Sequence, residues 1–336
     1  MKVLVAPLNW GLGHASRCIP LIRHYLVQGD EVVLGGDGES LLLLRRHFPT
    51  LRVLPLGALR LMYSKRDSQV WAMVRALPKI VGFSVQDHRL LRRYEAEEKF
   101  DLVISDNRFG LWTSGTRCVY ITHQLRIFLP QRWRRLEPLA RYLHRAVYRH
   151  YDEVWVPDRE QDGLSGDLSH HLPSDTRVRY IGTLSRFEGC AEMHIDSRFS
   201  GYDVVAVLSG LEPQRTMLEE RIIRRYARSA ERVLIVQGQV GKAATCLSHT
   251  NITIVPHLND TDMAAALLSA KHIIARSGYS TIMDLYALGV LSRAELIPTP
   301  GQPEQEYLSQ CIMNLSKPLH RRECAGRGLR KHIIAI

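Results

Sequence analysis

The sequence predicts an α/β protein with two doubly wound parallel-sheet domains that face each other across a cleft. Three observations lead to this prediction. Short apolar runs alternate with segments of helical periodicity, and this alternation occurs in two series separated by a weakly periodic stretch. The 336 residues also suffice for two domains with separate cores. We therefore expect an N-terminal domain over 1–184, a linker over 185–201 and a C-terminal domain over 202–336.

The first series begins with an apolar run that is broken by Pro7 and followed by a glycine-containing loop and a helix that ends before Gly29. The same order of strand, loop and helix continues along the series. Expected strands lie at 2–6, 31–35, 51–56, 101–105, 118–122, 153–156 and 178–181, and expected helices at 15–28, 39–47 and 68–98. Apolar strands that alternate with helices are typical of a parallel sheet.

The second series repeats this organisation after the linker. Its first helix has Pro213 in the opening turn, where proline is well tolerated. Expected strands lie at 203–208, 232–237, 252–255, 272–275 and 295–298, and expected helices at 213–229, 260–270, from 279 onward and at 304–315. Both halves are thus predicted to be Rossmann-like. Ligands of open parallel sheets bind beyond the carboxyl ends of the strands, so we expect the substrate between the domains.

The net charge of +11 is concentrated in one part of the chain. Residues 108–149 contain nine arginines and one acid, Glu137, which gives this window a net charge of +8. The overlapping segment 125–151 interleaves arginine with aromatic residues and leucine at helical spacing, which suits an anionic membrane surface. An Arg-rich solvated helix face is the simpler alternative. No nucleic-acid-binding signature is found in the sequence, so no nucleic acid is expected as a partner.

The remaining composition predicts a cytoplasmic enzyme that has no metal and lies free or at the inner face of the membrane. The six cysteines are scattered without a C-x-x-C pair, and they are expected to be reduced thiols. The N-terminus does not resemble a signal peptide, and no apolar stretch approaches membrane-spanning length. The motif D-T-D at 260–262 precedes a helical pattern, so we interpret it as a helix N-cap rather than a metal site.

The segment 276–284 is predicted to be a strand, a tight polar turn and a helix. The first turn of such a helix offers unpaired N–H groups and a positive dipole end, which suit an anion. The residues expected to contact it are Ser277, Gly278, Tyr279, Ser280 and Thr281. Asp284 lies about one turn further along and could accept hydrogen bonds from a ribose. The segment therefore predicts a nucleotide site, although the serines and threonine could also simply cap the helix.

Polar residues follow strands in the first domain as well. Gly11 and Gly13 let the backbone approach a ligand closely, and His14 stands where a base would point into the cleft. Asp106 and His123 each end a strand at its carboxyl edge. A capping Asp and satisfied histidines are the ordinary alternatives.

The second domain contains a similar turn at its first strand. Ser209 and Gly210 could cradle a phosphate there, and Arg215 could reach it with two hydrogen bonds. Pro213 as a helix starter is the ordinary explanation of this turn.

These motifs together resemble the two-domain GT-B glycosyltransferases, and within them the MurG-type enzymes of glycosyltransferase family 28 and their relatives. The resemblance is strongest over 257–308, in M-A-A-A at 263–266, R-S-G-x-x-T-x-x-D at 276–284 and P-x-P-G-Q-x-E-Q-E-Y at 298–307. It implies that residues 278–281 meet the diphosphate of a UDP-sugar and Asp284 the ribose, where MurG enzymes usually have Glu. It also implies that the base of the nucleotide lies near His257 and Leu258. Gln305, with Glu304, would bind the hydroxyls of the donor sugar.

The leading hypothesis is inverting, metal-independent transfer of a hexosyl group from a UDP-sugar to an acceptor hydroxyl on a glycan or a lipid-linked molecule of the cell envelope. UDP-sugar is the donor substrate, and no cofactor is expected. His14 would deprotonate the acceptor, and Asp106 would orient His14. This pairing is known in some plant GT-B enzymes.

Two alternatives remain open. The motif G-x-G-H-x-x-R-C at 11–18 is also similar to the UDP-sugar hydrolases of the pseudaminic acid pathway, in which water would replace the acceptor. The other alternative is a non-catalytic, basic lipid- or nucleic-acid-binding protein on this scaffold. The basic end at 315–336 is shorter than the tail that usually crosses back to the first domain in related enzymes, which could weaken closure.

Overall fold

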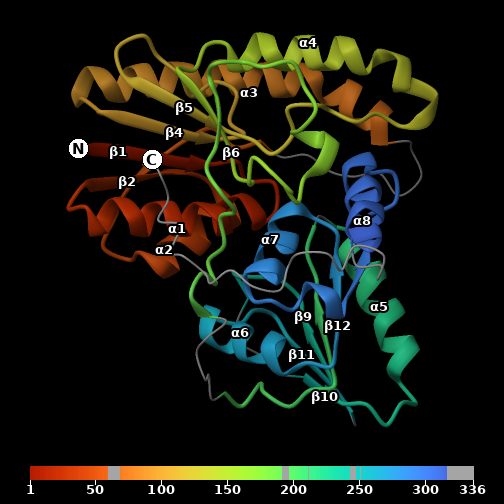
Figure 1. The fold of residues 1–336 in the computed structure, drawn as a ribbon. Helices are drawn as coiled ribbons and strands as arrows, with labels where there is room; N and C mark the ends of the chain where they lie inside the picture. The colour runs from red at the N-terminus through yellow and green to blue at the C-terminus, as the bar shows by residue number, and fades with distance from the viewer. Residues whose placement is uncertain (60–68, 191–196, 211, 243–246, 250, 316–336) are drawn as a thin grey trace.

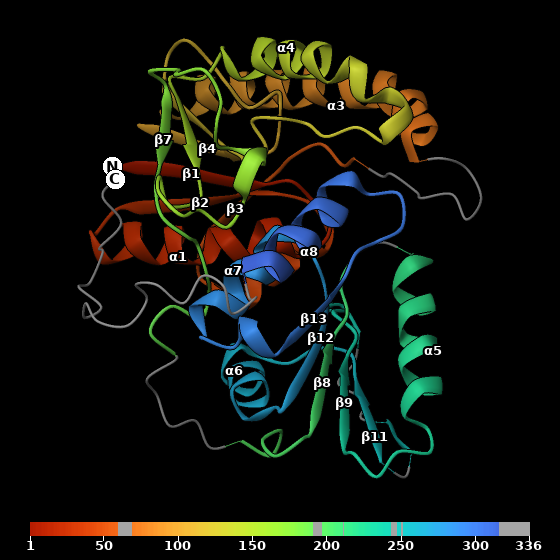
Figure 2. The same cartoon turned by 45° about the vertical axis from the view of Figure 1, so that its right-hand side comes forward.

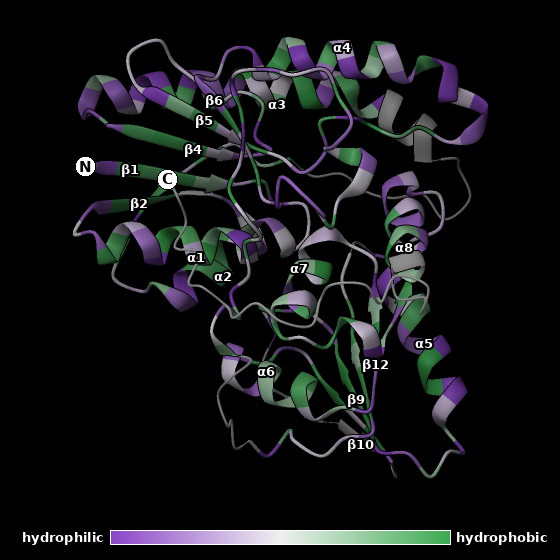
Figure 3. Cartoon of the chain, viewed as in Figure 1, coloured by the Kyte–Doolittle hydropathy of each residue, from purple (hydrophilic) through white to green (hydrophobic). Residues whose placement is uncertain are grey.

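The computed structural model describes the chain except for residues 60–68, 191–196, 211, 243–246, 250 and 316–336. Two sheets lie one above the other, each covered by helices (Figure 1). Figure 3 shows their central strands mainly in the colour of hydrophobic residues, as expected for strands buried on both faces. The predicted fold class of two parallel α/β domains is confirmed.

The first sheet has seven parallel strands in the order β3-β2-β1-β4-β5-β6-β7. Its strands are β1 (Lys2–Pro7), β2 (Glu31–Gly36), β3 (Arg52–Pro55), β4 (Leu102–Asp106), β5 (Arg117–Ile121), β6 (Glu153–Val156) and β7 (Val178–Tyr180). Its helices are α1 (Gly13–Val27), α2 (Gly38–His47), α3 (Gln69–Glu97) and α4 (Glu137–Tyr148), with short 3-10 turns η1 (Gln131–Leu136) and η2 (Gly166–Leu168).

The alternation of side chains along β1 divides the first core into two layers. Val3 and Val5 pack in a cluster with α1 and α2, whereas Leu4 and Ala6 belong to the cluster on the other face, with α3 and α4. All four are fully buried. This two-sided burial explains why the strand is a continuous apolar run rather than an alternating one.

The second sheet has the order β10-β11-β9-β8-β12-β13, and all pairs are parallel except β10 with β11. Its strands are β8 (Val204–Val207), β9 (Val233–Val236), β10 (Leu247–His249), β11 (Ile252–Val255), β12 (His272–Arg276) and β13 (Ala294–Ile297). Its helices are α5 (Gln214–Tyr226), α6 (Asp260–Ser269), α7 (Tyr279–Ala287) and α8 (Pro303–Leu315), with a 3-10 turn η4 (Leu291–Arg293). Side chains of α5 pack on one face, and those of α6, α7 and α8 on the other.

Each expected strand is present within one or two residues of its predicted bounds. The antiparallel strand β10 was not expected, and the basic segment forms η1 and α4. The first sheet ends at Tyr180 and the second begins at Val204, and the proposed linker lies between them. The domain boundaries themselves stay a prediction. The basic end at 316–336 lies outside the described residues, and in the described part no helix has the length and apolarity needed to cross a membrane.

Candidate active site

A histidine and an aspartate meet at the carboxyl edge of the first sheet. Pro7 pairs with Asp106 in the β1–β4 register, so the loop after β1 and the end of β4 lie at the same edge. His14, in the first turn of α1, places Nδ1 2.8 Å from Oδ1 of Asp106. Asp106 is fully buried, whereas the side chain of His14 remains 16% exposed. The histidine is therefore held by Asp106 and remains partly exposed.

Arg17, one turn further along α1, fixes this pair. Its side chain is 1% exposed and donates from Nε to Oδ2 of Asp106 at 2.6 Å, and from Nη2 to Oδ1. Burial alone would raise the pKa of Asp106, but the charge of Arg17 and the contact with His14 outweigh it and hold this pKa well below its usual range. Asp106 is therefore ionised at neutral pH.

The ionised carboxylate decides the tautomer of His14. A carboxylate only accepts hydrogen bonds, so the 2.8 Å contact requires the proton on Nδ1, although Nη2 of Arg17 also lies 3.0 Å from this nitrogen. The lone pair of His14 is then on Nε2, away from Asp106. This is the arrangement that a general base needs.

A second histidine lies on the other side of Arg17. Nη1 of Arg17 is 3.1 Å from Nδ1 of His123, and Nε2 of His123 is 2.7 Å from Oε1 of Glu304, in the first turn of α8. Burial lowers the pKa of His123, so we assign a neutral ring that accepts from Arg17 and donates from Nε2 to Glu304. The ring stacks on Tyr279, with centroids 4.4 Å apart and planes 5° from parallel.

The start of α7 also lies directly against the first domain. Ser280 Oγ donates to the carbonyl of Gly13 at 3.0 Å, and Tyr279 donates its hydroxyl to the carbonyl of Pro157 at 2.9 Å. A Cβ at Gly13 would lie 2.9 Å from Ser280 Oγ, so a larger residue here would require Ser280 to shift. No side chain caps α7 at Gly278 within the part of the chain that is described. Figures 1 and 2 both place α7 and α8 between the two sheets.

The turn before α7 is fixed by contacts within the second domain. Ser277 Oγ donates to the carbonyl of Gln305 at 2.8 Å, and Oε1 of Gln305 accepts from the backbone of Thr299 at 2.9 Å. The side chain of Thr281 is on the same first turn as Ser280. These predicted residues are therefore gathered around one helix start.

Asp284 and His257, the residues predicted to contact the ribose and the base of the nucleotide, lie near Arg186. Arg186 was not among the predicted site residues. Asp284 accepts from the Ser185 hydroxyl at 2.7 Å and lies 3.8 Å from Nε of Arg186. Burial raises the pKa of Asp284 to about 6. Burial, aided by Arg186 and other cations, lowers the pKa of His257 to about 4. Leu258 is in the core of the second domain. No local motif marks Arg186, because its position depends on where the connection crosses between domains.

Three other predicted residues follow β8. Ser209 and Gly210 are in the loop after this strand, and Gly210 has a φ of 94°, which favours glycine. Arg215 donates from Nε and Nη2 to Oε1 of Glu212, at 3.0 and 2.7 Å. Its guanidinium is thus occupied by a neighbour on the same turn. Gly11, in the first loop, also has a positive φ of 77°.

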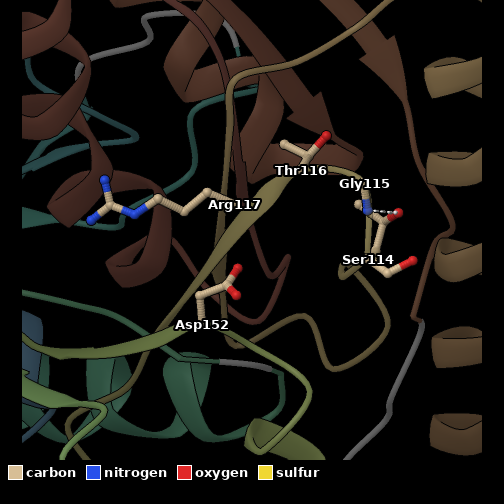
Figure 4. A pocket seen from close by; sticks show the side chains of 6 residues that line it. Ser114, Gly115, Thr116, Arg117 and Asp152 are labelled. Atoms are coloured by element: carbon tan, nitrogen blue, oxygen red, sulfur yellow. Dashed lines mark hydrogen bonds between the residues drawn. The ribbon is translucent and has the colours of Figure 1, made fainter.

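A separate depression lies at the other edge of the first sheet. It is lined by Thr113, Ser114, Gly115, Thr116, Arg117 and Asp152, at the amino end of β5 and just before β6 (Figure 4). Parallel α/β sheets bind ligands at the carboxyl edge, where His14 and Asp106 lie. We therefore do not assign the substrate to this depression. The described residues include no group of three or more His, Cys, Asp or Glu placed to hold a metal ion.

Comparisons with known proteins identify the fold. No protein-family model matches the chain. It is 23% identical over 329 residues to an uncharacterized glycosyltransferase of Methanosarcina acetivorans, covering 91% of this chain and 82% of the other. It also matches solved structures of the glycosyltransferase of kitacinnamycin (TM-score 0.58, 14% identity, 94% and 84% of the two chains) and of CalG4, the calicheamicin glycosyltransferase (0.56, 12%, 94% and 89%).

The fold is GT-B. A third match is UGT2 of Phytolacca americana, complexed with UDP-2-fluoro-glucose and pterostilbene (0.55, 14%, 94% and 83%). The predicted GT-B architecture is thus confirmed, and the narrower resemblance to MurG-type enzymes stays a prediction.

Proposed function

We propose that this protein transfers a hexosyl group from a UDP-sugar to an acceptor hydroxyl. The observation that carries the proposal is the placement of the His14–Asp106 pair next to the uncapped start of α7, where Ser280 contacts Gly13. A base for the acceptor and a site for an anionic leaving group are thus adjacent. The similarity to a glycosyltransferase sequence and to a plant structure holding a UDP-sugar analogue supports this function.

In the proposed reaction, Nε2 of His14 takes the proton of the acceptor hydroxyl while the oxygen of this hydroxyl attacks the anomeric carbon of the donor sugar. Asp106 keeps the imidazole in the required tautomer and stabilises the imidazolium that forms. The carbon passes through an oxocarbenium-like state, and single displacement inverts its configuration. UDP departs with increased negative charge, which the free N–H groups and the dipole of α7 stabilise without a metal ion.

The second domain would hold the donor in this proposal. The diphosphate would meet the first turn of α7, and the loops containing Gly11 and Ser209 would approach it from either side. Asp284 would exchange its bond with Ser185 for the ribose hydroxyls, with the base near His257. Glu304 and Gln305, at the start of α8, would hold the sugar hydroxyls.

A thermal-shift screen tests donor binding. UDP, UDP-GlcNAc, UDP-Glc, UDP-Gal and other nucleotides are added separately to the native protein. A ligand at about 100 times its Kd stabilises the native state by about 2.7 kcal/mol, which is measurable as a higher midpoint. The proposal predicts a response to UDP and a larger one to one UDP-sugar. A response to another nucleotide, or to none, contradicts it.

Hydrolysis of a UDP-sugar is the second candidate function. It is favoured by the motif at 11–18 and by the partial exposure of His14, because the same base could deprotonate water. Incubation of the protein with UDP-sugars alone distinguishes the two reactions. Steady sugar release without an acceptor indicates hydrolysis, whereas release that requires an added acceptor indicates transfer.

We also propose that α4 with η1 contacts an anionic membrane surface, which would place the enzyme at the cytoplasmic face of the membrane and suit a lipid-linked acceptor. Leu136, Leu139, Tyr142 and Leu143 are between 44% and 68% exposed. In 131–149, the only acid, Glu137, is buried, whereas all six arginines are exposed. Apolar side chains surrounded by cations fit lipid headgroups.

A non-catalytic lipid- or DNA-binding protein would show such binding without affinity for UDP.

A further inference from the structure

Within the described residues, three hydrogen bonds of 3.0 Å or less join the first turns of α7 and α8 to the first domain. Two of them, from Ser280 and Tyr279, end on backbone carbonyls. The third joins two side chains, Nε2 of His123 and Oε1 of Glu304, at 2.7 Å. This third contact links a residue expected to hold the donor sugar to a side chain of the other domain, and the neighbouring Gln124 also contributes a side-chain hydrogen bond to Glu304.

His123 is rigidly placed for this contact. Arg17 donates to its Nδ1, and the ring is stacked on Tyr279. Its side chain is 8% exposed, whereas that of Glu304 is 29% exposed. The histidine is thus fixed within the protein, and the side chain of the glutamate that it binds is partly exposed. A carboxylate has about four lone-pair positions, so Glu304 can keep His123 and still accept from a ligand.

We propose that His123 is a positioning residue for the donor sugar, acting by holding the Glu304 carboxylate in the orientation that accepts sugar hydroxyls. The inference rests on the proposed function. It assigns part of the donor-sugar site to the first domain, so that the sugar is recognised only when the two domains are closed. The nucleotide would be held mainly by the second domain, through the start of α7 and Asp284.

The same contact connects the donor side to the acceptor base. Arg17 bonds Asp106 on one side and His123 on the other. One buried guanidinium therefore supports both the His14–Asp106 base and the His123–Glu304 pair. When the domains close and Glu304 contacts His123, the acceptor base and the donor-sugar contact are thus both held by Arg17. Pre-organisation of this kind raises affinity because the carboxylate loses less freedom on binding.

The test uses His123→Phe, which keeps a stacking ring but cannot donate, and His123→Gln, whose amide can donate from a similar position. Dissociation constants for UDP, UDP-GlcNAc, UDP-Glc and UDP-Gal are measured by calorimetry on the full chain. For the UDP-sugar that native protein binds best, we expect His123→Phe to weaken binding about tenfold, the effect of one hydrogen bond to a charged group. Binding of UDP should be unchanged, and His123→Gln should restore part of the sugar affinity.

A double-mutant cycle keeps the inference testable if the Phe variant is less stable. In a Glu304→Ala background, His123→Phe should not weaken sugar binding further, because its effect passes through the missing carboxylate. Glu306→Ala, on the same helix, is the matched control and should bind like the native protein. Equal weakening of UDP and UDP-sugar, tighter sugar binding, or additive effects in the cycle overturn the inference. Failure of native protein to bind any UDP compound instead overturns the proposed function on which it rests.

Discussion

Replacing Asp284 with Asn should stabilise the protein at neutral pH while weakening nucleotide binding. Burial raises the pKa of this carboxyl from 3.8 to about 6, even though Ser185 and Arg186 oppose the change. Above pH 6, the folded protein therefore holds a charge that is more stable in the unfolded chain. The interval between the two pKa values corresponds to about 3 kcal/mol, at about 1.4 kcal/mol per pKa unit. Asn resembles the neutral acid, so Asp284→Asn should recover up to about this amount at pH 7.5.

The sign of the pH dependence follows from the same shift. Between pH 3.8 and about 6 the folded state binds more protons at Asp284 than the unfolded state does, so this residue's contribution to stability falls as pH rises through that range. Urea unfolding at pH 7.5 and at pH 4.5 should show a large advantage of Asp284→Asn at the higher pH and a small one at the lower pH. Comparing the two proteins at each pH cancels the titration of other groups. A variant that is less stable at pH 7.5, or whose advantage does not change with pH, refutes the reasoning.

Three other perturbations test separate parts of the site. His14→Ala should lower turnover by about 10² to 10⁴-fold, the usual contribution of a general base, with little change in the thermal midpoint, whereas His24→Ala on the same helix should keep full turnover. Asp106→Asn should destabilise the fold by about 3–5 kcal/mol, because it leaves the buried Arg17 unpaired. Since the pKa of Asp106 is depressed, this difference in urea unfolding should be present above about pH 4 and shrink in acid. Replacing Arg132, Arg134 and Arg135 with Ser should reduce binding to phosphatidylserine liposomes in a flotation assay, whereas the same change at Arg221, Arg224 and Arg228 should not; unchanged binding in the first variant contradicts the membrane surface.

Much of the fold could be predicted from the sequence because its strands are buried on both faces. The run at β1 is apolar at consecutive positions, since Val3 and Leu4 enter different core layers. Such runs stand out against the helical patterns between them. The strand β10 could not be predicted in this way, because it is three residues long and pairs antiparallel at the end of the sheet. Its existence depends on its partner, β11, and not on a local pattern.

The candidate site was predictable where chain topology alone brings residues together. His14 and Asp106 follow neighbouring parallel strands, and the carboxyl ends of such strands share one edge. Arg17 was not recognised, because an arginine inside a helical pattern is usually solvated. Its role emerges only from complete burial against Asp106. The role of Arg186 and the contact of His123 with Glu304 likewise depend on how the domains are placed relative to each other. The separate local patterns do not encode this placement.

Several polar groups expected to bind the donor are paired with other residues of the protein. Ser280 bonds Gly13, Asp284 bonds Ser185, and Glu304 bonds His123. Buried polar groups left unpaired would be destabilising, so these contacts stabilise the arrangement of the two domains. A donor must then exchange the bonds of Ser280 and Asp284 for its own hydrogen bonds, which limits its ground-state affinity, whereas Glu304 keeps its bond to His123. The bond between His14 and Asp106 is different in kind, because no step of the proposed reaction breaks it. The catalytic pair is therefore expected to keep its geometry throughout the cycle, while Ser280 and Asp284 exchange partners.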